Sequence, residues 1–125
     1  MRRLSALSVL LVATVLVACA TLPPAKPVLD LGTIAGTWQG TVTSSSGTSP
    51  YTLTIKEDGL WEGVAPDIPP GRFEGKMSVK EGKIRFISHT MGRTGTYTLH
   101  EGEGQRVLSG RTDDGSITIR LTPAR

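Results

Sequence analysis

The chain has 125 residues, with 14 Lys and Arg, 11 Asp and Glu, and a single cysteine. This length suits one small domain, and a lone cysteine excludes an internal disulfide. Basic and acidic residues are interspersed without a Lys/Arg block, which argues against nucleic-acid binding.

The first 18 residues have the pattern of an export signal. Arg2 and Arg3 precede an apolar run from Leu4 to Ala18. A run of about fifteen residues is short for a membrane-spanning helix and typical of a signal-peptide core. Because both arginines belong to this segment, the remaining chain carries twelve basic and eleven acidic residues, a net charge of about +1.

The end of this run, Leu16-Val17-Ala18-Cys19, resembles the lipobox of bacterial lipoproteins, in which the cysteine is acylated and becomes the new N-terminus. The resemblance implies a palmitate-bearing lipid anchor on Cys19. Since Ala20 rather than Asp follows, it also implies sorting to the outer membrane, facing the periplasm. The alternative is an ordinary secretory signal cut after Ala20, because Ala18-Cys19-Ala20 also fits a small-x-small cleavage rule.

Residues 19–31 contain three prolines and no alternation of apolar and polar residues. This composition predicts a semi-extended tether that carries a domain off the membrane surface. The alternative is that Val28, Leu29 and Leu31 pack onto the domain as a short cap.

Residues 32–125 read as strands almost throughout. Apolar residues alternate with polar ones, and short Gly-bearing turns such as Asp58-Gly59 and Asp114-Gly115 separate the alternating segments. The predicted strands are 36–43, 50–57, 60–64, 72–80, 83–88, 94–100, 106–112 and 116–122. Eight antiparallel strands joined in sequence are expected to close into an up-and-down barrel, which removes exposed sheet edges. A β-sandwich is the second possibility.

Gly36-Thr37-Trp38 on the first predicted strand is similar to the Gly-x-Trp motif of lipocalin-like, or calycin-like, barrels. The resemblance implies that the tryptophan lies at the closed end of the barrel, where a late-strand basic residue often covers it. Arg120 is the candidate, although the alternation of its strand points it outward.

A Gly-x-aromatic-x-Gly pattern occurs three times, around Trp38, Trp61 and Phe73. On a strand these three positions share one face, so the ring can lie over its own glycine neighbours and fill the space they leave. The repetition indicates a packing device rather than a ligand motif.

The alternation also predicts which side chains fill the barrel. An eight-stranded interior is filled by side chains or holds one small ligand. We expect a mostly filled core, with a small apolar pocket near one end as the alternative and Gly40, Gly75 and Gly95 as the places where space is left. The predicted inward residues are Trp38, Val42, Tyr51, Leu53, Ile55, Phe73, Met77, Val79, Ile84, Phe86, Tyr97, Leu99, Ile117, Ile119 and Leu121.

In an up-and-down barrel, alternate connections lie at the same end. The longer ones, 44–49, 65–71 and 89–93, share an end with the turn at Asp114-Gly115 and form the candidate binding rim, opposite the tether. The candidate rim residues are Asp67, Arg72, His89 and Arg93.

Trp61 is the candidate exposed aromatic for a partner contact. Its neighbours Leu60 and Val64 have the opposite parity, so either Trp61 or that pair faces outward. A bulge next to Gly63 is a further interpretation.

No catalytic or cofactor motif stands out. His89 and His100 lie apart without paired spacing, and no Gly-x-Ser-x-Gly is present, so we expect no metal, no cofactor and no enzymatic activity. We expect a monomeric, non-catalytic cell-envelope lipoprotein that binds a protein or another envelope component through the rim. The alternatives are a carrier of a small hydrophobic ligand, which needs a cavity of roughly 300 Å³ or more, and a purely structural envelope protein.

Overall fold

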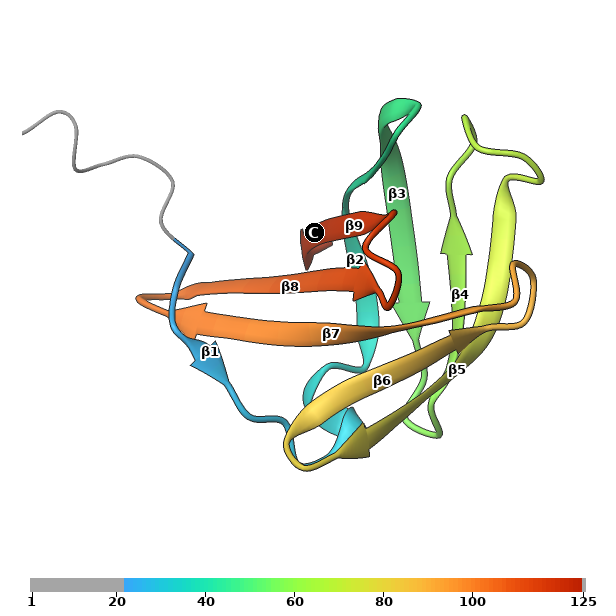
Figure 1. Cartoon of the computed structure of the whole chain (residues 1–125). Helices are drawn as coiled ribbons and strands as arrows, with labels where there is room; N and C mark the ends of the chain where they lie inside the picture. The colour runs from blue at the N-terminus through green and yellow to red at the C-terminus, as the bar shows by residue number, and fades with distance from the viewer. Residues whose placement is uncertain (1–21, 125) are drawn as a thin grey trace, which may run out of the picture.

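The computed structural model describes residues 22–124 and confirms the predicted all-β fold (Figure 1). Strands β2 to β9 form a closed antiparallel up-and-down barrel, in which each strand pairs with the next and β9 closes on β2. The alternative sandwich is not observed. The eight strands are β2 (Gly36–Ser44), β3 (Gly47–Ile55), β4 (Leu60–Val64), β5 (Arg72–Lys80), β6 (Lys83–Ser88), β7 (Arg93–Gly102), β8 (Gln105–Thr112) and β9 (Thr118–Pro123).

A two-residue strand, β1 (Ala25–Lys26), and a short 3-10 helix, η2 (Leu31–Thr33), precede the barrel. Within residues 22–124, no helix is long and apolar enough to cross a membrane.

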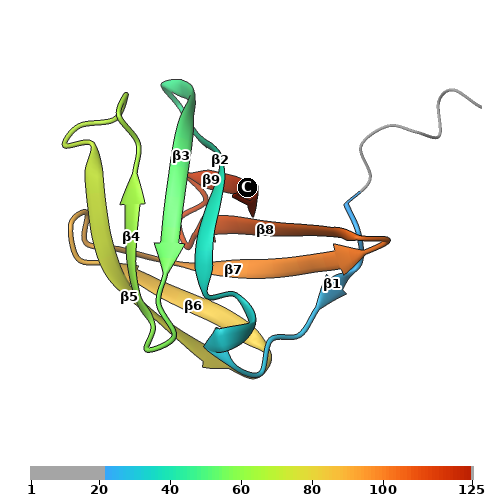
Figure 2. The same ribbon diagram turned by 180° about the vertical axis from the view of Figure 1, so that it is seen from behind.

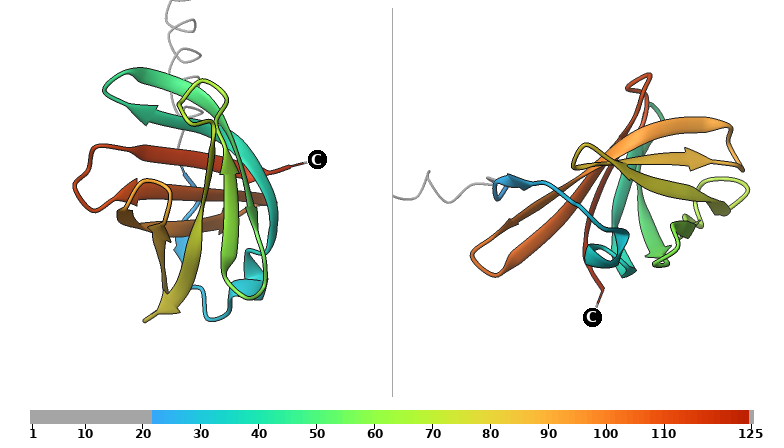
Figure 3. Two further views of the ribbon diagram at one scale, coloured as in Figure 1. Left: turned by 90° about the vertical axis from the view of Figure 1, so that its right-hand side faces the viewer. Right: turned by 90° about the horizontal axis from the view of Figure 1, so that it is seen from below.

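The barrel is flattened, with its two halves crossing. In Figure 1, strands β2, β3 and β4 run nearly upright while β6, β7 and β8 run across them, and Figure 3 shows the same crossing from the side. Such crossed packing brings the inner faces of the two halves together around one core.

The core follows the predicted alternation. In β5, Phe73, Gly75 and Met77 are buried while the residues between them are exposed. All fifteen predicted inward residues are buried, except that Val79 and Ile117 are half-buried. The alternation therefore identified the inner face of the barrel.

The connection between β2 and β3 is shorter than the predicted loop at 44–49, because β2 extends to Ser44 and β3 begins at Gly47. The hydroxyls of Thr43 and Thr48 lie 3.0 Å apart across this extension. Pro50 is tolerated in β3 because it lies beyond the last residue that β4 pairs with, so its missing N–H removes no ladder bond on that side.

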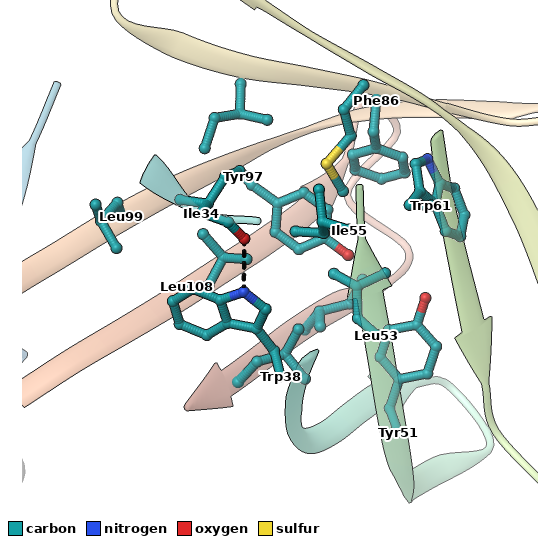
Figure 4. Packing of buried hydrophobic residues seen from close by; sticks show 14 of the residues in the cluster. Ile34, Trp38, Tyr51, Leu53, Ile55, Trp61, Phe86, Tyr97, Leu99 and Leu108 are labelled. Atoms are coloured by element: carbon teal, nitrogen blue, oxygen red, sulfur yellow. Dashed lines mark hydrogen bonds between the residues drawn. The ribbon is translucent and has the colours of Figure 1, made fainter. Parts of the chain in front are cut away.

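One end of the barrel is closed by the chain that enters it. Val28 and Ile34 are almost fully buried there, and the backbone N–H of Val28 donates to the Gly82 carbonyl at 2.9 Å. Trp38 is buried at the same end, as predicted, and its Nε1 donates to the Ile34 carbonyl at 2.9 Å (Figure 4). Seen from below in Figure 3, η2 lies across this end.

The basic residue over Trp38 is Arg106, not Arg120. The Arg106 guanidinium carbon lies 5.3 Å from the ring centroid, and the same group donates to Glu101 and to the Thr33 carbonyl at 2.7 and 2.8 Å. In β8, residue 106 shares its parity with the inward Leu108, whereas Arg120 is exposed on the outer face of β9. A basic side chain therefore covers Trp38, but it comes from β8 and not from β9.

Residues 22–31 lie on the barrel instead of leaving it as a free tether. β1 pairs with β7 through Ala25 and His100, beyond the end of β6 (Figure 2). Val28 is buried and Leu31 packs against the core, whereas Leu29 is 85% exposed. Val28 and Leu31 therefore pack onto the domain as the cap interpretation predicted, whereas Leu29 does not. The segment covers a stretch of β7 that β6 leaves as an edge, which explains why it packs despite lacking alternation.

Candidate functional site

The barrel interior opens at the end opposite the N-terminal segment, in an apolar cavity of about 80 Å³. We call this cavity and its entrance the mouth pocket. Ile68, Met91 and Ile117, each from a different connection, line it near the entrance. The remaining lining residues are Val42, Tyr51, Trp61, Ala65, Phe73, Phe86, Ser88, Arg93, Tyr97, Thr112 and Ile119.

Three aromatic side chains that line the mouth pocket pack against glycines of neighbouring strands. Trp61 pairs directly with Gly75, and a Cβ added to Gly75 would meet the indole ring at 2.8 Å. Phe86 pairs in the same way with Gly95, and Tyr97 with Gly110, where an added Cβ would meet either ring at 2.5 Å.

The glycines therefore make room for rings from the adjacent strand, which corrects the prediction that each ring covers glycines of its own strand. Gly36 confirms the difference, because an added Cβ there meets no atom within 4 Å. None of the three glycines expected to leave space does so: aromatic rings lie against Gly75 and Gly95, and the backbone of Arg120 lies against Gly40.

Trp61 faces into the barrel, which corrects its candidacy as an exposed aromatic. It is 6% exposed, whereas Leu60 is 45% exposed and points outward. No bulge is involved, because β4 stays in regular register with both neighbours. The parity was ambiguous because Gly63, the other inward position of β4, has no side chain and lies under the Tyr51 ring.

The Trp61 Nε1 is buried and donates to no acceptor within the described chain. Its ring meets Phe86 edge to face, with centroids 6.2 Å apart, and Figure 4 shows the indole nitrogen on the side of the Phe86 ring. Phe86 also packs against Tyr97 at 5.0 Å. A continuous aromatic wall therefore lines one side of the mouth pocket.

Two tyrosine hydroxyls lie in the same interior. Burial raises the pKa of Tyr51 and that of Tyr97 well above their ordinary value. An interaction between the two hydroxyls partly offsets this rise in the pKa of Tyr51 and adds to it in that of Tyr97. Both tyrosines are therefore protonated at neutral pH, and neither is poised to act as a general base.

Buried hydroxyls hold two of the rim connections in place. Ser88 is 5% exposed and accepts the Met91 backbone N–H at 3.2 Å, which fixes the turn between β6 and β7. Thr112, equally buried, accepts the Ile117 N–H at 3.1 Å and donates to Asp114 at 2.8 Å. The apolar residues at the mouth therefore sit on ordered turns.

The remaining rim loop is also closed by its own backbone. Ala65 N–H donates to the Gly71 carbonyl at 2.9 Å, and Ile68 N–H donates to the Ala65 carbonyl at 3.0 Å. This compact loop carries Ile68 to the mouth pocket.

Two ion pairs at the rim involve the turn between β8 and β9. Arg93 donates to Asp114 at 3.0 Å and to the Ser116 hydroxyl at 2.8 Å. The Ser116 backbone N–H, assisted by the Ser116 and Thr112 hydroxyls, lowers the pKa of Asp114 to about 2. Beside this pair, Arg85 binds both oxygens of Asp113 and holds the pKa of that carboxyl far below its usual range, with a further hydrogen bond from Thr94.

The four predicted rim residues lie at one end of the barrel but do not form one cluster. Arg93 lines the mouth pocket, whereas Arg72 is exposed and pairs with Glu62 at 2.8 Å. Asp67 and His89 are exposed, and within residues 22–124 no hydrogen bond or ion pair joins any two of the four. Cys19 lies outside the described residues.

Ile117 was predicted to face inward, whereas Ile68 and Met91 were not predicted at the mouth, because only polar loop residues were taken as candidates. Ile68 and Met91 are isolated apolar residues inside loops, flanked by Asp67 and Pro69 and by Thr90 and Gly92. A large apolar residue within a turn is the signal that would have identified them.

Over the described part of the chain, no group of three or more His, Cys, Asp or Glu side chains forms a potential metal site. A scan against protein-family models and searches of curated proteins and of solved structures found no match.

Proposed function

We propose that this chain is a non-catalytic cell-envelope lipoprotein that binds a partner protein through the rim, with one small apolar side chain of the partner inserted in the mouth pocket. The observation that carries the proposal is the mouth pocket itself: an apolar cavity of about 80 Å³ that opens at the rim beside Arg93. Buried apolar pockets of this kind hold the anchor residues that dominate protein–protein affinity.

The rigidity of the surrounding turns supports this proposal. Ser88 and Thr112 hold the turns that carry Met91 and Ile117, so little conformational entropy is lost when a partner binds. The Arg93–Asp114 pair places polar groups at the edge of the apolar centre, as in typical interfaces.

Cavity size favours this proposal over a carrier of hydrophobic ligands. Small-molecule sites have volumes of about 300 Å³ or more. The mouth pocket, at about 80 Å³, accommodates a short branched side chain and not a whole lipophilic molecule. The tightly packed aromatic rings on Gly75, Gly95 and Gly110 account for the small volume.

The chemistry of the pocket favours binding over catalysis. Its polar groups are already engaged: Ser88 and Thr112 hold rim turns, and Arg93 is paired with Asp114. The two interior tyrosines are held in the protonated form, as their raised pKa values indicate.

The proposed localisation rests on the lipobox at Cys19 and on the course of the chain. Lipidation of Cys19 would anchor the protein in the outer membrane, facing the periplasm. Residues 22–26 run along the closed end of the barrel, so the rim would face away from the membrane. The closed barrel, Trp38 and the Arg106 that covers it support a lipocalin-like assignment.

Capture of partners from detergent-solubilised envelope tests the proposed function. We expect the wild-type protein to retain a partner protein that Met91→Gln loses by about tenfold, because a polar group then blocks the mouth. Ile87→Gln is the matched control, since Ile87 is an apolar side chain on the same strand–turn unit but is 48% exposed on the outer face.

Equal capture by both variants would exclude the mouth pocket as the binding site. Mass spectrometry of the captured material for small molecules provides the second arm. A lipophilic compound recovered with the wild-type protein and lost with Met91→Gln would favour the carrier.

A further inference from the structure

A second concave surface lies on the outside of the barrel, away from the mouth pocket. It is a groove of about 510 Å³ that crosses four neighbouring strands, β2, β9, β8 and β7. Its lining residues are Thr41, Thr43, Thr96, Thr98, Ser109, Gly110, Arg111, Thr118, Ile119 and Arg120. We call it the hydroxyl groove, because most of these residues are Thr or Ser.

The register of the strands sets the rows of hydroxyls. Thr41 pairs with Arg120, Arg120 with Ser109, and Ser109 with Thr98, so one row crosses all four strands. A second row runs parallel to it through Thr43, Thr118, Arg111 and Thr96. Alternation along each strand directs both rows outward.

The two arginines of the groove differ from the other arginines of residues 22–124. Arg72, Arg85, Arg93 and Arg106 each form an ion pair with a carboxylate. Within residues 22–124, neither Arg111 nor Arg120 forms an ion pair, and no acidic residue lines the groove. The two arginines that form no ion pair within these residues therefore line one concave surface. The Arg111 guanidinium lies beside Gly115, at the turn between β8 and β9.

Several hydroxyls of the groove also retain free hydrogen-bonding capacity. The Ser109 hydroxyl forms a hydrogen bond with His100 Nε2 at 3.1 Å, and the Thr96 hydroxyl accepts one from Arg85 at 2.8 Å. Within residues 22–124, the hydroxyls of Thr41, Thr98 and Thr118 form no hydrogen bond. They are available to a ligand as both donors and acceptors.

We propose that the hydroxyl groove binds an acidic oligosaccharide, with its carboxylate or phosphate groups on Arg111 and Arg120 and its sugar hydroxyls on the threonine rows. The two arginines are diagonal neighbours across β8 and β9, with Cβ atoms about 7 Å apart. A guanidinium fork binds a carboxylate or a phosphate through two parallel hydrogen bonds. The groove volume lies within the range of about 300–1,000 Å³ of ligand sites.

The composition of the groove favours a glycan over a single-stranded nucleic acid. Nucleic-acid grooves combine positive charge with aromatic side chains on which bases stack. None of the lining residues is aromatic, whereas the threonine methyl groups provide small apolar contacts beside each hydroxyl. The groove shares Ile119 with the mouth pocket but none of its hydroxyl or arginine residues, so variants of those residues test the groove independently.

Titration calorimetry of the folded domain with defined probes tests this proposal. The probes are an oligosaccharide of uronic acids, a phosphorylated oligosaccharide, a neutral oligosaccharide of the same length and a single-stranded oligonucleotide. We expect binding of at least one acidic oligosaccharide and no binding of the neutral one. Comparison of the first two identifies the anion that the arginines prefer.

Variants assign the binding to the groove. Arg111→Gln with Arg120→Gln is expected to weaken binding about tenfold or more, and Thr41→Val with Thr118→Val to weaken it several-fold. Arg72→Gln with Lys76→Gln removes two cations from the outer face of β5 and is the charge-matched control. Melting temperatures establish that each variant is folded, and Arg111→Lys with Arg120→Lys keeps the charge if the glutamine pair fails to fold.

Equal losses in the groove variant and in the control variant would overturn the proposal, because the affinity would then depend on net charge alone. Absence of binding to both acidic oligosaccharides would also overturn it. So would binding of the oligonucleotide with the same affinity and the same dependence on Arg111 and Arg120.

Discussion

Trp38 and Trp61 are both buried tryptophans of the barrel, but only one of them has a partner for its indole nitrogen. Trp38 donates to the Ile34 carbonyl and lies under Arg106. Trp61 Nε1 has no acceptor within residues 22–124. Removing a donor leaves a buried carbonyl without its partner in the first case and removes an unsatisfied group in the second.

We therefore expect Trp38→Phe to lower the free energy of unfolding by about 1–2 kcal/mol more than Trp61→Phe. The measurement is urea unfolding followed by far-ultraviolet circular dichroism, which does not depend on tryptophan fluorescence. Equal losses in the two variants would show that ring volume, and not the hydrogen bond, determines the cost.

At the scale of elements, the segment from β1 to η2 contributes to the stability of the barrel. Val28 is 1% exposed and its neighbour Leu29 is 85% exposed, so the two residues form a matched pair. Val28→Ala is expected to cost about 2 kcal/mol of unfolding free energy, because it opens a cavity at the closed end. Leu29→Ala is expected to stay within about 0.5 kcal/mol of the wild type. Equal, small effects would mean that the segment detaches as a free tether.

The turn between β8 and β9 makes a pH-dependent contribution to stability. Hydrogen bonds from Ser116 lower the pKa of Asp114 to about 2, and those from Arg85 and Thr94 lower that of Asp113 further. In the unfolded chain both carboxyls titrate near their ordinary value of about 4. Their contribution is therefore complete above about pH 4 and is lost as the pH falls toward 2.

We expect the urea midpoint of Asp114→Asn to be lower than that of the wild type at pH 7 and to change less between pH 4 and pH 2. Asp67→Asn is the control, because Asp67 is an exposed carboxylate of a neighbouring rim loop. A parallel decline of wild type and Asp114→Asn below pH 4 would contradict the assignment of this pH dependence to the turn.

At the scale of the whole molecule, the parts of the fold that follow local periodicity were predictable and those that depend on pairing were not. Alternation in segments such as 72–80 gives both the strand and its inner face. The pairing of Trp61 with Gly75 depends on the register between strands, which a single sequence does not specify. A small apolar pocket was left open as an alternative, but its lining by Ile68 and Met91 was not predicted, because it depends on where three separate connections meet.

The packing of residues 22–31 and the position of Arg106 were unpredictable for another reason. Residues 22–31 show no alternation of apolar and polar residues, and their contacts with β7 and Gly82 arise only once the barrel is closed. The pairing of β8 with β9 ends at Leu108 and Leu121, so residue 106, the next inward position of β8, lies beyond the paired region and its side chain reaches over Trp38.

The course of the chain predicts how the whole molecule is oriented on a membrane if Cys19 carries the lipid. Two residues, Ala20 and Thr21, separate Cys19 from Leu22, so the two positions are at most about 11 Å apart along the chain. Leu22 and Pro23 lie beside the turn between β7 and β8 at the closed end. The closed end should therefore be held close to the membrane surface, with the rim pointing away.

Labelling at the two ends tests this orientation in lipid vesicles. Gln105→Cys places a dye at the closed end and Ser46→Cys places one at the rim, and both positions are exposed. We expect energy transfer to an acceptor lipid to be clearly stronger from position 105, and Cys19→Ala to abolish it at both positions. Equal transfer from the two labels would contradict the predicted orientation, and vesicle binding retained in Cys19→Ala would contradict the lipid anchor.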